Sequence, residues 1–319
     1  MASLYFNASE VELKDRETIL DALLRNGHDI PNGCRAGACQ SCLMQAVKGQ
    51  VPAAAQVGLK ESQKKRGYFL SCSCVPTESM EISLEDGVVD KVQAVVTEKQ
   101  WLNQSVVRVG VKADLDYFSG QYVTLWKDQR IPRSYSLASV PGRDLLLQFH
   151  IKRYPTGTFS RWAYDEMQVG DTLEVQGPFG DCFYANSDLT QPIFMAAIGT
   201  GLAPLYGIVR DALIQGHKGQ ITMIIGARYS SQFYLVKELI ALTDRYNNFS
   251  IEFVAMESTN GIFNQGDIYQ ISKDRVSSLK DHKVFLCGAA SFVKKMKKQC
   301  FLAGAAMKDI ASDSFMPFA

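Results

Sequence analysis

The sequence lacks an excess of charge of either sign: its 319 residues include 34 Lys and Arg against 33 Asp and Glu, a formal charge of +1. Without a basic field to attract a phosphate backbone, we expect no nucleic-acid binding. No run of about 18 apolar residues occurs, and no basic stretch followed by an apolar core opens the chain. We therefore expect no membrane span and no secretion signal, and hence a cytoplasmic protein.

Cysteine is too sparse for a disulfide scaffold, with 8 residues in the whole chain. Hydrophobic residues make up 46% and charged residues 21%, which is typical of globular proteins and excludes a disordered chain. At about 150 residues per domain, the length predicts two or three domains.

Five of the eight cysteines nevertheless fall within 41 residues, which indicates a metal site. Three of them read Cys34-x4-Cys39-x2-Cys42, and Cys72 follows after 29 intervening residues. This is the spacing of plant-type 2Fe-2S ferredoxins. The small residues between the first two cysteines would let backbone amides approach the sulfides of such a cluster.

The fourth ligand is a choice between two neighbours. We assign Cys72, because it ends an apolar stretch where a strand or turn could hold it, and we expect Cys74 to be a packed thiol. Structural zinc is the alternative to a cluster. Zinc sites usually pair two short knuckles with two to four residues between the cysteines, whereas the second pair here is Cys-x-Cys. By default, the isolated Cys182, Cys287 and Cys300 are core residues.

On these cysteines, residues 1–86 resemble the plant-type ferredoxin domain. The resemblance implies a β-grasp fold that holds a 2Fe-2S cluster near one surface. Gln40 departs from the glycine that many relatives carry after the second ligand. We expect this difference to change hydrogen bonding at the cluster, and hence its potential, but not its ligation.

The middle of the chain consists of short alternating runs. Six strands are expected, over residues 92–102, 105–113, 120–126, 133–139, 144–153 and 172–177. Such a set predicts a closed or nearly closed antiparallel barrel. In the fifth strand Leu145, Leu147, Phe149 and Ile151 should share one face. A helix is expected over 159–167.

One strand carries the string Arg133-Ser134-Tyr135-Ser136. Arg can pair with a phosphate, Tyr can stack on a flat heterocycle, and Ser can hydrogen-bond to a ring nitrogen. Alone, the string would equally suit a solvated edge strand. It is followed in order by Phe-His-Ile-Lys at 149–152, Gly-Thr-Phe-Ser at 157–160 and Gly-Pro-Phe-Gly at 177–180. The series resembles the flavin domain of the ferredoxin-NADP reductase family.

That resemblance implies an FAD site. Arg133 would neutralise the pyrophosphate, Tyr135 would pack against the isoalloxazine, and Ser136 would lie near its reactive nitrogen. The remaining contacts are implied for the ribose and adenine side, at His150, Ile151 and Lys152, and for the phosphate site at the helix start, at Gly157, Thr158 and Ser160.

The last third alternates strands with helices, which predicts a parallel sheet with helices on its faces. Gly199-Thr200-Gly201 follows the apolar strand 192–198 but lacks the third glycine of the dinucleotide fingerprint, so alone it could be a tight turn. The loop resembles the Gly-Thr-Gly-x-Ala-Pro loop of the same reductase family, across which a nicotinamide dinucleotide lies. Ile198 departs from the glycine often found before that loop.

Three more positions take roles from this resemblance. Cys287-Gly288 matches the family's Cys-Gly pair near the nicotinamide. Arg228, with the hydroxyls of 229–231, would suit the 2′-phosphate of NADPH, but an exposed Arg is also an ordinary solvated residue, so we expect NADH with NADPH possible. Phe315 would either cover the flavin face or bury its ring in a domain interface.

The resemblance covers three successive domains: ferredoxin at 1–86, an FAD barrel at 90–186 and an NAD(P)-binding domain at 190–319. This order resembles the reductase components of bacterial multicomponent oxygenases, of the benzoate dioxygenase reductase type. It implies that electrons pass from NADH through FAD and the 2Fe-2S cluster to a Rieske or di-iron oxygenase. Tyr135, Ser136 and Cys287 would lie closest to the reacting atoms.

Other readings of the same domains stay open. The electron chain could serve a deoxysugar-synthesis enzyme or a desaturase, or the protein could be a non-enzymatic redox-sensing regulator. The basic segment 60–67 could dock an acidic partner or simply be a solvated face.

Overall fold

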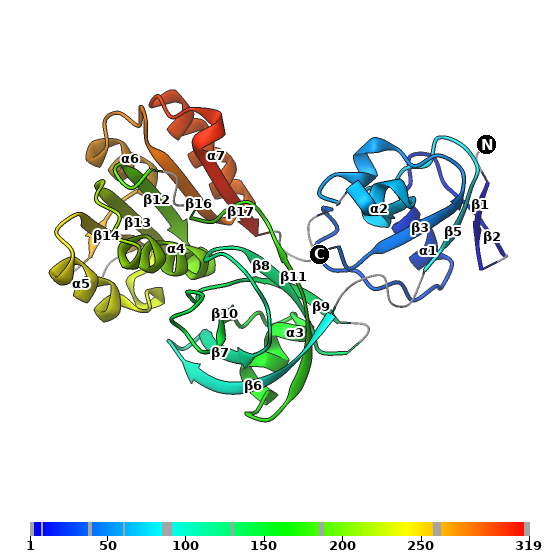
Figure 1. Cartoon of the computed structure of the whole chain (residues 1–319), viewed down its shortest axis with the longest axis horizontal. Helices are drawn as coiled ribbons and strands as arrows, with labels where there is room; N and C mark the ends of the chain where they lie inside the picture. The colour runs from blue at the N-terminus through cyan, green and yellow to red at the C-terminus, as the bar shows by residue number, and fades with distance from the viewer. Residues whose placement is uncertain are drawn as a thin grey trace.

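The computed structural model describes residues 3–7, 9–37, 40–59, 61–84, 91–128, 131–184, 188–257 and 263–315. Three sheets follow one another along the chain, and Figure 1 shows the first beside a unit formed by the other two. The predicted fold classes are confirmed: a small α+β domain with a mixed sheet, an antiparallel barrel and a parallel α/β domain. No helix in the described part of the chain is long and apolar enough to span a membrane.

The first sheet is mixed, with the strand order β2-β1-β5-β3-β4. Its elements are β1 (Leu4–Phe6), β2 (Ser9–Val11), α1 (Ile19–Arg25), β3 (Leu43–Lys48), η1 (Ala53–Gln56), α2 (Glu61–Lys65), β4 (Tyr68–Leu70), η2 (Ser71–Ser73) and β5 (Met80–Ser83). Thr18 caps α1 by accepting a hydrogen bond from the Asp21 amide, and Leu20 and Leu23 of the helix are buried in the core. The long loop between α1 and β3 holds the first three cysteines of the motif.

The second sheet is antiparallel throughout, with the order β10-β7-β6-β11-β8-β9. Its elements are β6 (Lys91–Trp101), β7 (Val106–Lys112), β8 (Tyr122–Trp126), β9 (Pro132–Ser136), β10 (Leu147–Lys152), α3 (Thr158–Arg161), the π-helical turn η3 (Trp162–Glu166) and β11 (Thr172–Phe179). Leu137, directly after β9, pairs with Phe149 of β10, which joins the two edge strands and closes the barrel.

Two details of this domain differ from the sequence prediction. Leu145 does not share the core face: its side chain is 97% exposed, because the Val140 amide donates to Asp144 and a turn precedes β10. The expected helix over 159–167 is split into α3 and η3. It ends at Met167, whose backbone amide donates a hydrogen bond to the Trp162 carbonyl.

The third sheet is parallel, with the order β15-β14-β13-β12-β16-β17. Its elements are β12 (Ile193–Ile198), η4 (Gly199–Gly201), α4 (Leu202–Ile214), β13 (Ile221–Tyr229), η5 (Ser230–Gln232), α5 (Val236–Arg245), β14 (Phe249–Glu257), β15 (Asn264–Gln265), α6 (Ile268–Arg275), β16 (Lys283–Ala289), α7 (Ala290–Leu302), η6 (Met307–Asp309) and β17 (Ile310–Phe315). Sequence reasoning missed α6, which is mostly polar, and β17, whose Ser and Asp obscure the strand pattern.

The barrel and the parallel sheet are packed tightly together. Arg210 of α4 makes a two-pronged ion pair with Asp144 of the barrel, at 2.8 and 2.9 Å, and both side chains are largely buried. Gly207, one turn earlier in α4, lies so close to the barrel that a Cβ there would meet the Leu137 carbonyl oxygen at 3.1 Å. These contacts make the two domains one unit.

We expect the ion pair to stabilise this unit measurably. Removing its cation in Arg210→Met leaves the Asp144 carboxylate without its partner, which should lower the free energy of unfolding by about 2 kcal/mol. Chemical denaturation of the single variants and of Arg210→Met with Asp144→Asn isolates the pairwise contribution. Additive losses would show that the pair contributes nothing.

Candidate functional site: a cavity between the barrel and the parallel sheet

The cysteines of the N-terminal loop converge as the spacing predicts. The pKa of the Cys72 thiol is lowered to about 6, chiefly by its hydrogen bond with Cys42, and Cys34 is close enough to act on it electrostatically. Gly37 donates its amide to Cys72 and has φ of +74°, and a Cβ there would meet the Ser73 hydroxyl at 3.0 Å. The loop therefore wraps closely round three thiols. Cys39 lies outside the described residues.

Cys74 differs from Cys72 although it is only two residues away. It is fully buried in the core of the first domain, and burial raises the pKa of its thiol to about 12. A thiol that stays protonated among apolar side chains is a poor ligand, since metals bind the thiolate. No three His, Cys, Asp or Glu of the described residues form a group that could hold a metal ion.

The main cavity of the molecule has a volume of about 1220 Å³ and lies between the barrel and the carboxyl ends of the parallel strands. Most of the predicted flavin and nucleotide residues line it: Arg133, Tyr135, Ser136, His150, Lys152, Gly157, Thr158, Ser160, Gly199, Thr200, Arg228 and Phe315. Cys34 of the cysteine loop also lines this cavity. The fold thus brings residues from three domains to one site.

Aromatic side chains form much of the barrel's wall of the cavity. The rings of Tyr135 and Phe159 are 5.4 Å apart, and Tyr154 lies beneath the Lys152 ammonium at 5.6 Å. The sequence prediction assigned neither Phe159 nor Tyr154 to the site, although Phe159 lies within the Gly-Thr-Phe-Ser string; Tyr154 lies in none of the predicted strings. Flat apolar surfaces beside Arg133 suit a cofactor that joins a ring system to phosphates.

The side chain of Ile151 corrects the predicted set. It belongs to the buried core of the barrel and does not line the cavity, because alternate residues of β10 face opposite sides and His150 and Lys152 take the cavity face. The hydroxyl of Ser160 already accepts one hydrogen bond within the barrel, from the Tyr154 amide at 3.3 Å. Gly157, which has no side chain, leaves room for this hydroxyl.

His150 links the two halves of the site. Its Nδ1 lies 3.3 Å from the hydroxyl of Tyr234, which belongs to the parallel-sheet domain, and its Nε2 has no hydrogen-bond partner among the described residues. Burial lowers the pKa of His150 to about 3, so the ring is neutral at physiological pH. A neutral imidazole with one free nitrogen in the cavity wall can hydrogen-bond to a ligand.

Asp313 is a site residue that sequence reasoning missed. Ser136 donates its hydroxyl to the Asp313 carboxylate at 2.6 Å, across 177 residues of sequence. Burial raises the pKa of Asp313 to about 6, although the bond from Ser136 acts in the opposite direction. Nothing in the local pattern of the last strand distinguishes this carboxylate from a surface one. Its position therefore emerges only when β17 joins the sheet.

The glycine loops meet at the carboxyl ends of β12 and β16. A Cβ on Gly201 would overlap the Cys287 carbonyl, and one on Gly288 would meet the Ile198 carbonyl oxygen at 3.0 Å. Both glycines are therefore required by backbone packing. A side chain at either position would push the two loops apart, although neither glycine itself lines the cavity.

Cys287 itself does not line the cavity. Its thiol is fully buried 3.6 Å from the thiol of Cys182 of the barrel domain, and burial, with Cys182 beside it, raises the pKa of Cys287 well above the usual range. Such a thiol is a poor nucleophile. The thiol therefore lies in the interface between the two domains, and not in the cavity wall beside the reacting atoms, where the sequence prediction placed it.

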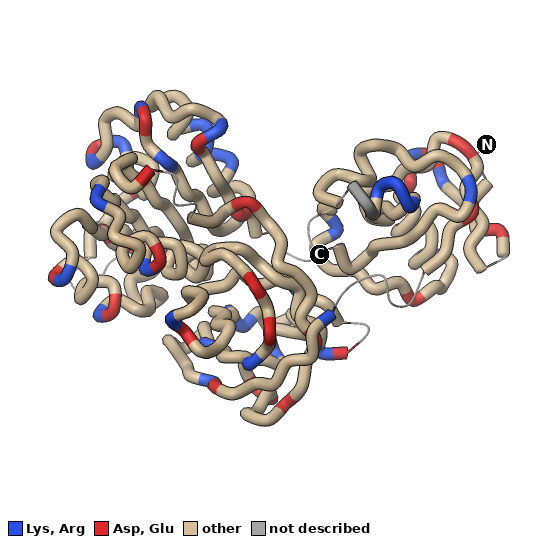
Figure 2. The backbone as a smooth tube through the Cα atoms, in the orientation of Figure 1, with Lys and Arg blue, Asp and Glu red and all other residues tan. Residues whose placement is uncertain are grey.

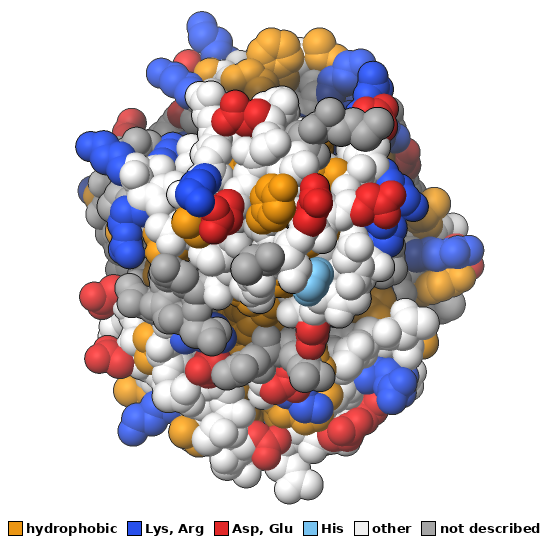
Figure 3. Space-filling view, turned by 90° about the vertical axis from the view of Figure 1, so that its right-hand side faces the viewer, with side chains coloured by type: hydrophobic (Ala, Val, Ile, Leu, Met, Phe, Trp, Pro, Cys, Tyr) orange, Lys and Arg blue, Asp and Glu red, His pale blue; other side chains and the backbone are white. Residues whose placement is uncertain are grey.

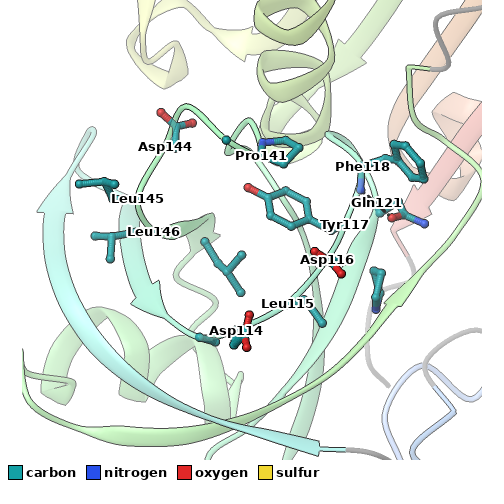
Figure 4. A pocket seen from close by; sticks show the side chains of 14 residues that line it. Asp114, Leu115, Asp116, Tyr117, Phe118, Gln121, Pro141, Asp144, Leu145 and Leu146 are labelled. Atoms are coloured by element: carbon teal, nitrogen blue, oxygen red, sulfur yellow. Dashed lines mark hydrogen bonds between the residues drawn. The ribbon is translucent and has the colours of Figure 1, made fainter.

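A second cavity of about 460 Å³ lies on the barrel, between the loop around Asp114–Phe118 and the turn around Pro141–Leu146 (Figure 4). The ring of Tyr117 stands in it, and its hydroxyl donates to Ser139 at 2.8 Å. None of the predicted site residues lines this cavity, so it takes no part in the predicted chemistry.

Family models match all three domains. Residues 5–77 match the 2Fe-2S iron-sulfur cluster binding domain, 93–184 the oxidoreductase FAD-binding domain, and 195–298 the oxidoreductase NAD-binding domain. The first match decides between the cluster and zinc in favour of the cluster. The converging thiols fit a 2Fe-2S cluster, and the cavity with its cations and aromatic rings fits FAD and a nicotinamide dinucleotide.

Relatives cover almost the whole chain. The reductase component of the naphthalene 1,2-dioxygenase/salicylate 5-hydroxylase systems of Ralstonia sp. is 28% identical over 94% of each chain. That of propane 2-monooxygenase from Gordonia sp. strain TY-5 is 28% identical over 89% of this chain and 88% of the relative. A cytochrome P450 reductase from Amycolatopsis superposes with a TM-score of 0.71 at 25% identity, over 99% of both chains.

These relatives are aligned with all three domains, since they cover 89–94% of this chain. The chain is therefore an NAD(P)H-dependent flavin and iron-sulfur oxidoreductase, and over most of its length it is similar to the electron-transfer reductase components of oxygenase systems.

Proposed function

We propose that the protein takes electrons from NADH and delivers them to a terminal oxygenase of the Rieske or di-iron type. The observation that carries this proposal is the shared cavity, whose wall combines flavin residues of the barrel, the nucleotide loop of the parallel sheet and Cys34 of the cluster loop. Bound FAD would accept a hydride from the nicotinamide and release electrons singly to the 2Fe-2S cluster.

The chain's own residues bind and orient these groups. Arg133 and Lys152 supply positive charge for phosphates, and Tyr135 supplies an apolar wall for a ring. Ser136, held by Asp313, presents its oxygen to the cavity. Cys34, Cys39, Cys42 and Cys72 would hold the cluster. No general base is needed, because a hydride moves directly between the two rings.

The acceptor would approach the ferredoxin domain. Figure 2 shows Lys and Arg gathered at α2, next to the cluster-bearing part of this domain, while Figure 3 shows acidic and basic side chains interspersed over the face on this side of the molecule. A mixed surface with one short basic segment gives a weak and reversible contact that depends on ionic strength. Such a contact suits a reductase that must release its acceptor after each electron.

An anaerobic titration tests the proposed donor. We expect NADH to bleach both the flavin and the 2Fe-2S absorption of the purified protein, because all three sites meet at one cavity. We also expect the reduced protein to support turnover of a Rieske or di-iron oxygenase, assayed beside a cytochrome P450. Bleaching by NADPH alone, or turnover of the P450 alone, would contradict the proposal.

A pair of neighbouring cysteines tests the cluster ligands. Cys72→Ser should lose most of the cluster's iron, sulfide and visible absorption, because its oxygen is a poorer ligand than a thiolate. Cys74→Ala is the matched control and should keep the cluster, since Cys74 lies in the apolar core. Iron and sulfide analysis of both variants decides the matter, and the reverse pattern would transfer the ligand role to Cys74.

The Ser136–Asp313 hydrogen bond should make flavin reduction depend on pH. Below about 6 the carboxyl of Asp313 is protonated and no longer accepts the Ser136 proton as a carboxylate does. We expect the rate of flavin reduction by NADH to fall severalfold as pH drops through this value, and Asp313→Asn to abolish the titration. Stopped-flow absorbance between pH 5 and 8 measures both. An unchanged titration in the variant would assign it to another group.

A further inference from the structure

An acidic side chain lies beside the arginine that the parallel-sheet domain contributes to the cavity wall. Arg228 is the residue that a 2′-phosphate would need, and it lines the cavity at the end of β13. Its guanidinium, however, lies 3.8 Å from the carboxylate of Glu257, at the end of the neighbouring strand β14. The two strand ends are in register, with Tyr229 opposite Glu257.

We propose that Glu257 selects NADH against NADPH, an inference that rests on the proposed function and names its specificity residue. In parallel-sheet nucleotide sites an acidic side chain at a strand end hydrogen-bonds the ribose 2′-hydroxyl, whereas an Arg accepts the 2′-phosphate. Here the two side chains lie 3.8 Å apart, so the Glu257 carboxylate offsets part of the positive charge that a phosphate would use. A phosphate bound to Arg228 would lie beside this carboxylate and be repelled by it.

The neighbouring Ser230 hydroxyl does little to offset that repulsion. Ser230, one of the hydroxyls expected to assist a phosphate, is only 6% exposed. The guanidinium of Arg228 is also held 5.2 Å from the centre of the Tyr229 ring, which keeps it beside the strand end. A ribose with a free 2′-hydroxyl can instead donate to the carboxylate without disturbing the pair.

The pair is placed for selectivity rather than for stability. The side chains of Arg228 and Glu257 are 69% and 61% exposed, and ion pairs so open to water contribute little to folding. Substitutions at either position should therefore leave the fold intact. This makes both residues suitable for a kinetic test.

The test compares kcat/KM for NADH and NADPH with an artificial acceptor. Glu257→Gln removes the negative charge and frees Arg228, so the NADPH to NADH ratio should rise about tenfold. The gain should vanish when Arg228→Gln is added. Asp244→Asn is the matched charge control. Asp244 lies near the end of α5, which leads into the start of β14, and hence at the amino ends of the strands, away from the cavity. Its ratio should not change.

Three results would overturn the inference. The first is a ratio in Glu257→Gln within twofold of the parent, with NADH turnover intact. The second is a ratio that changes in Lys295→Gln and not in Arg228→Gln, since Lys295 also belongs to the parallel-sheet domain and lines the cavity. The third is a parent protein that prefers NADPH. A flavin-loaded protein that neither nucleotide reduces would refute the proposed function itself, and with it this inference.

Discussion

The structure depends on holding two separately folded domains in one fixed arrangement. Hydride transfer requires the two rings to be in contact, yet the barrel supplies the walls for one ring and the parallel sheet supplies the loop for the other. The ion pair of Arg210 with Asp144 and the close approach at Gly207 fix this arrangement from outside the cavity. Inside it, the bond from Ser136 to Asp313 spans the same two domains.

The site is built largely from backbone and small residues where the domains meet. Gly201 and Gly288 allow two loops to touch, and the buried thiols of Cys182 and Cys287 fill the space below them. Both domains contribute positive charge to the cavity wall, with Arg133 from the barrel and Arg228 from the parallel sheet. Cations and aromatic rings in one cavity suit dinucleotides, which join phosphates to flat rings.

The cluster loop completes the electron path. Cys34 faces the shared cavity, while Cys42 is buried behind it and Cys72 comes from the turn after β4. A cluster held by these thiols would therefore lie beside the shared cavity, where it could take single electrons from a bound flavin.

The sequence by itself determined the local features. The cysteine spacing, the alternating strands of the barrel and the Gly-Thr-Gly turn each depend on residues a few positions apart, and chemistry of that kind is visible in one dimension. The choice of Cys72 rather than Cys74 was also a local argument, and the fold places the two thiols at the motif and in the core respectively.

Only the tertiary structure decided which side chains share the cavity. Asp313 and Tyr234 reach it from strands and turns that carry no motif, while the side chain of Ile151 leaves it through the alternation of β10. The neighbour that offsets part of the charge of Arg228 lies 29 residues away in sequence, at Glu257. Burial and pairing at such distances arise when strands are brought into register, because local propensity does not specify which strands become neighbours.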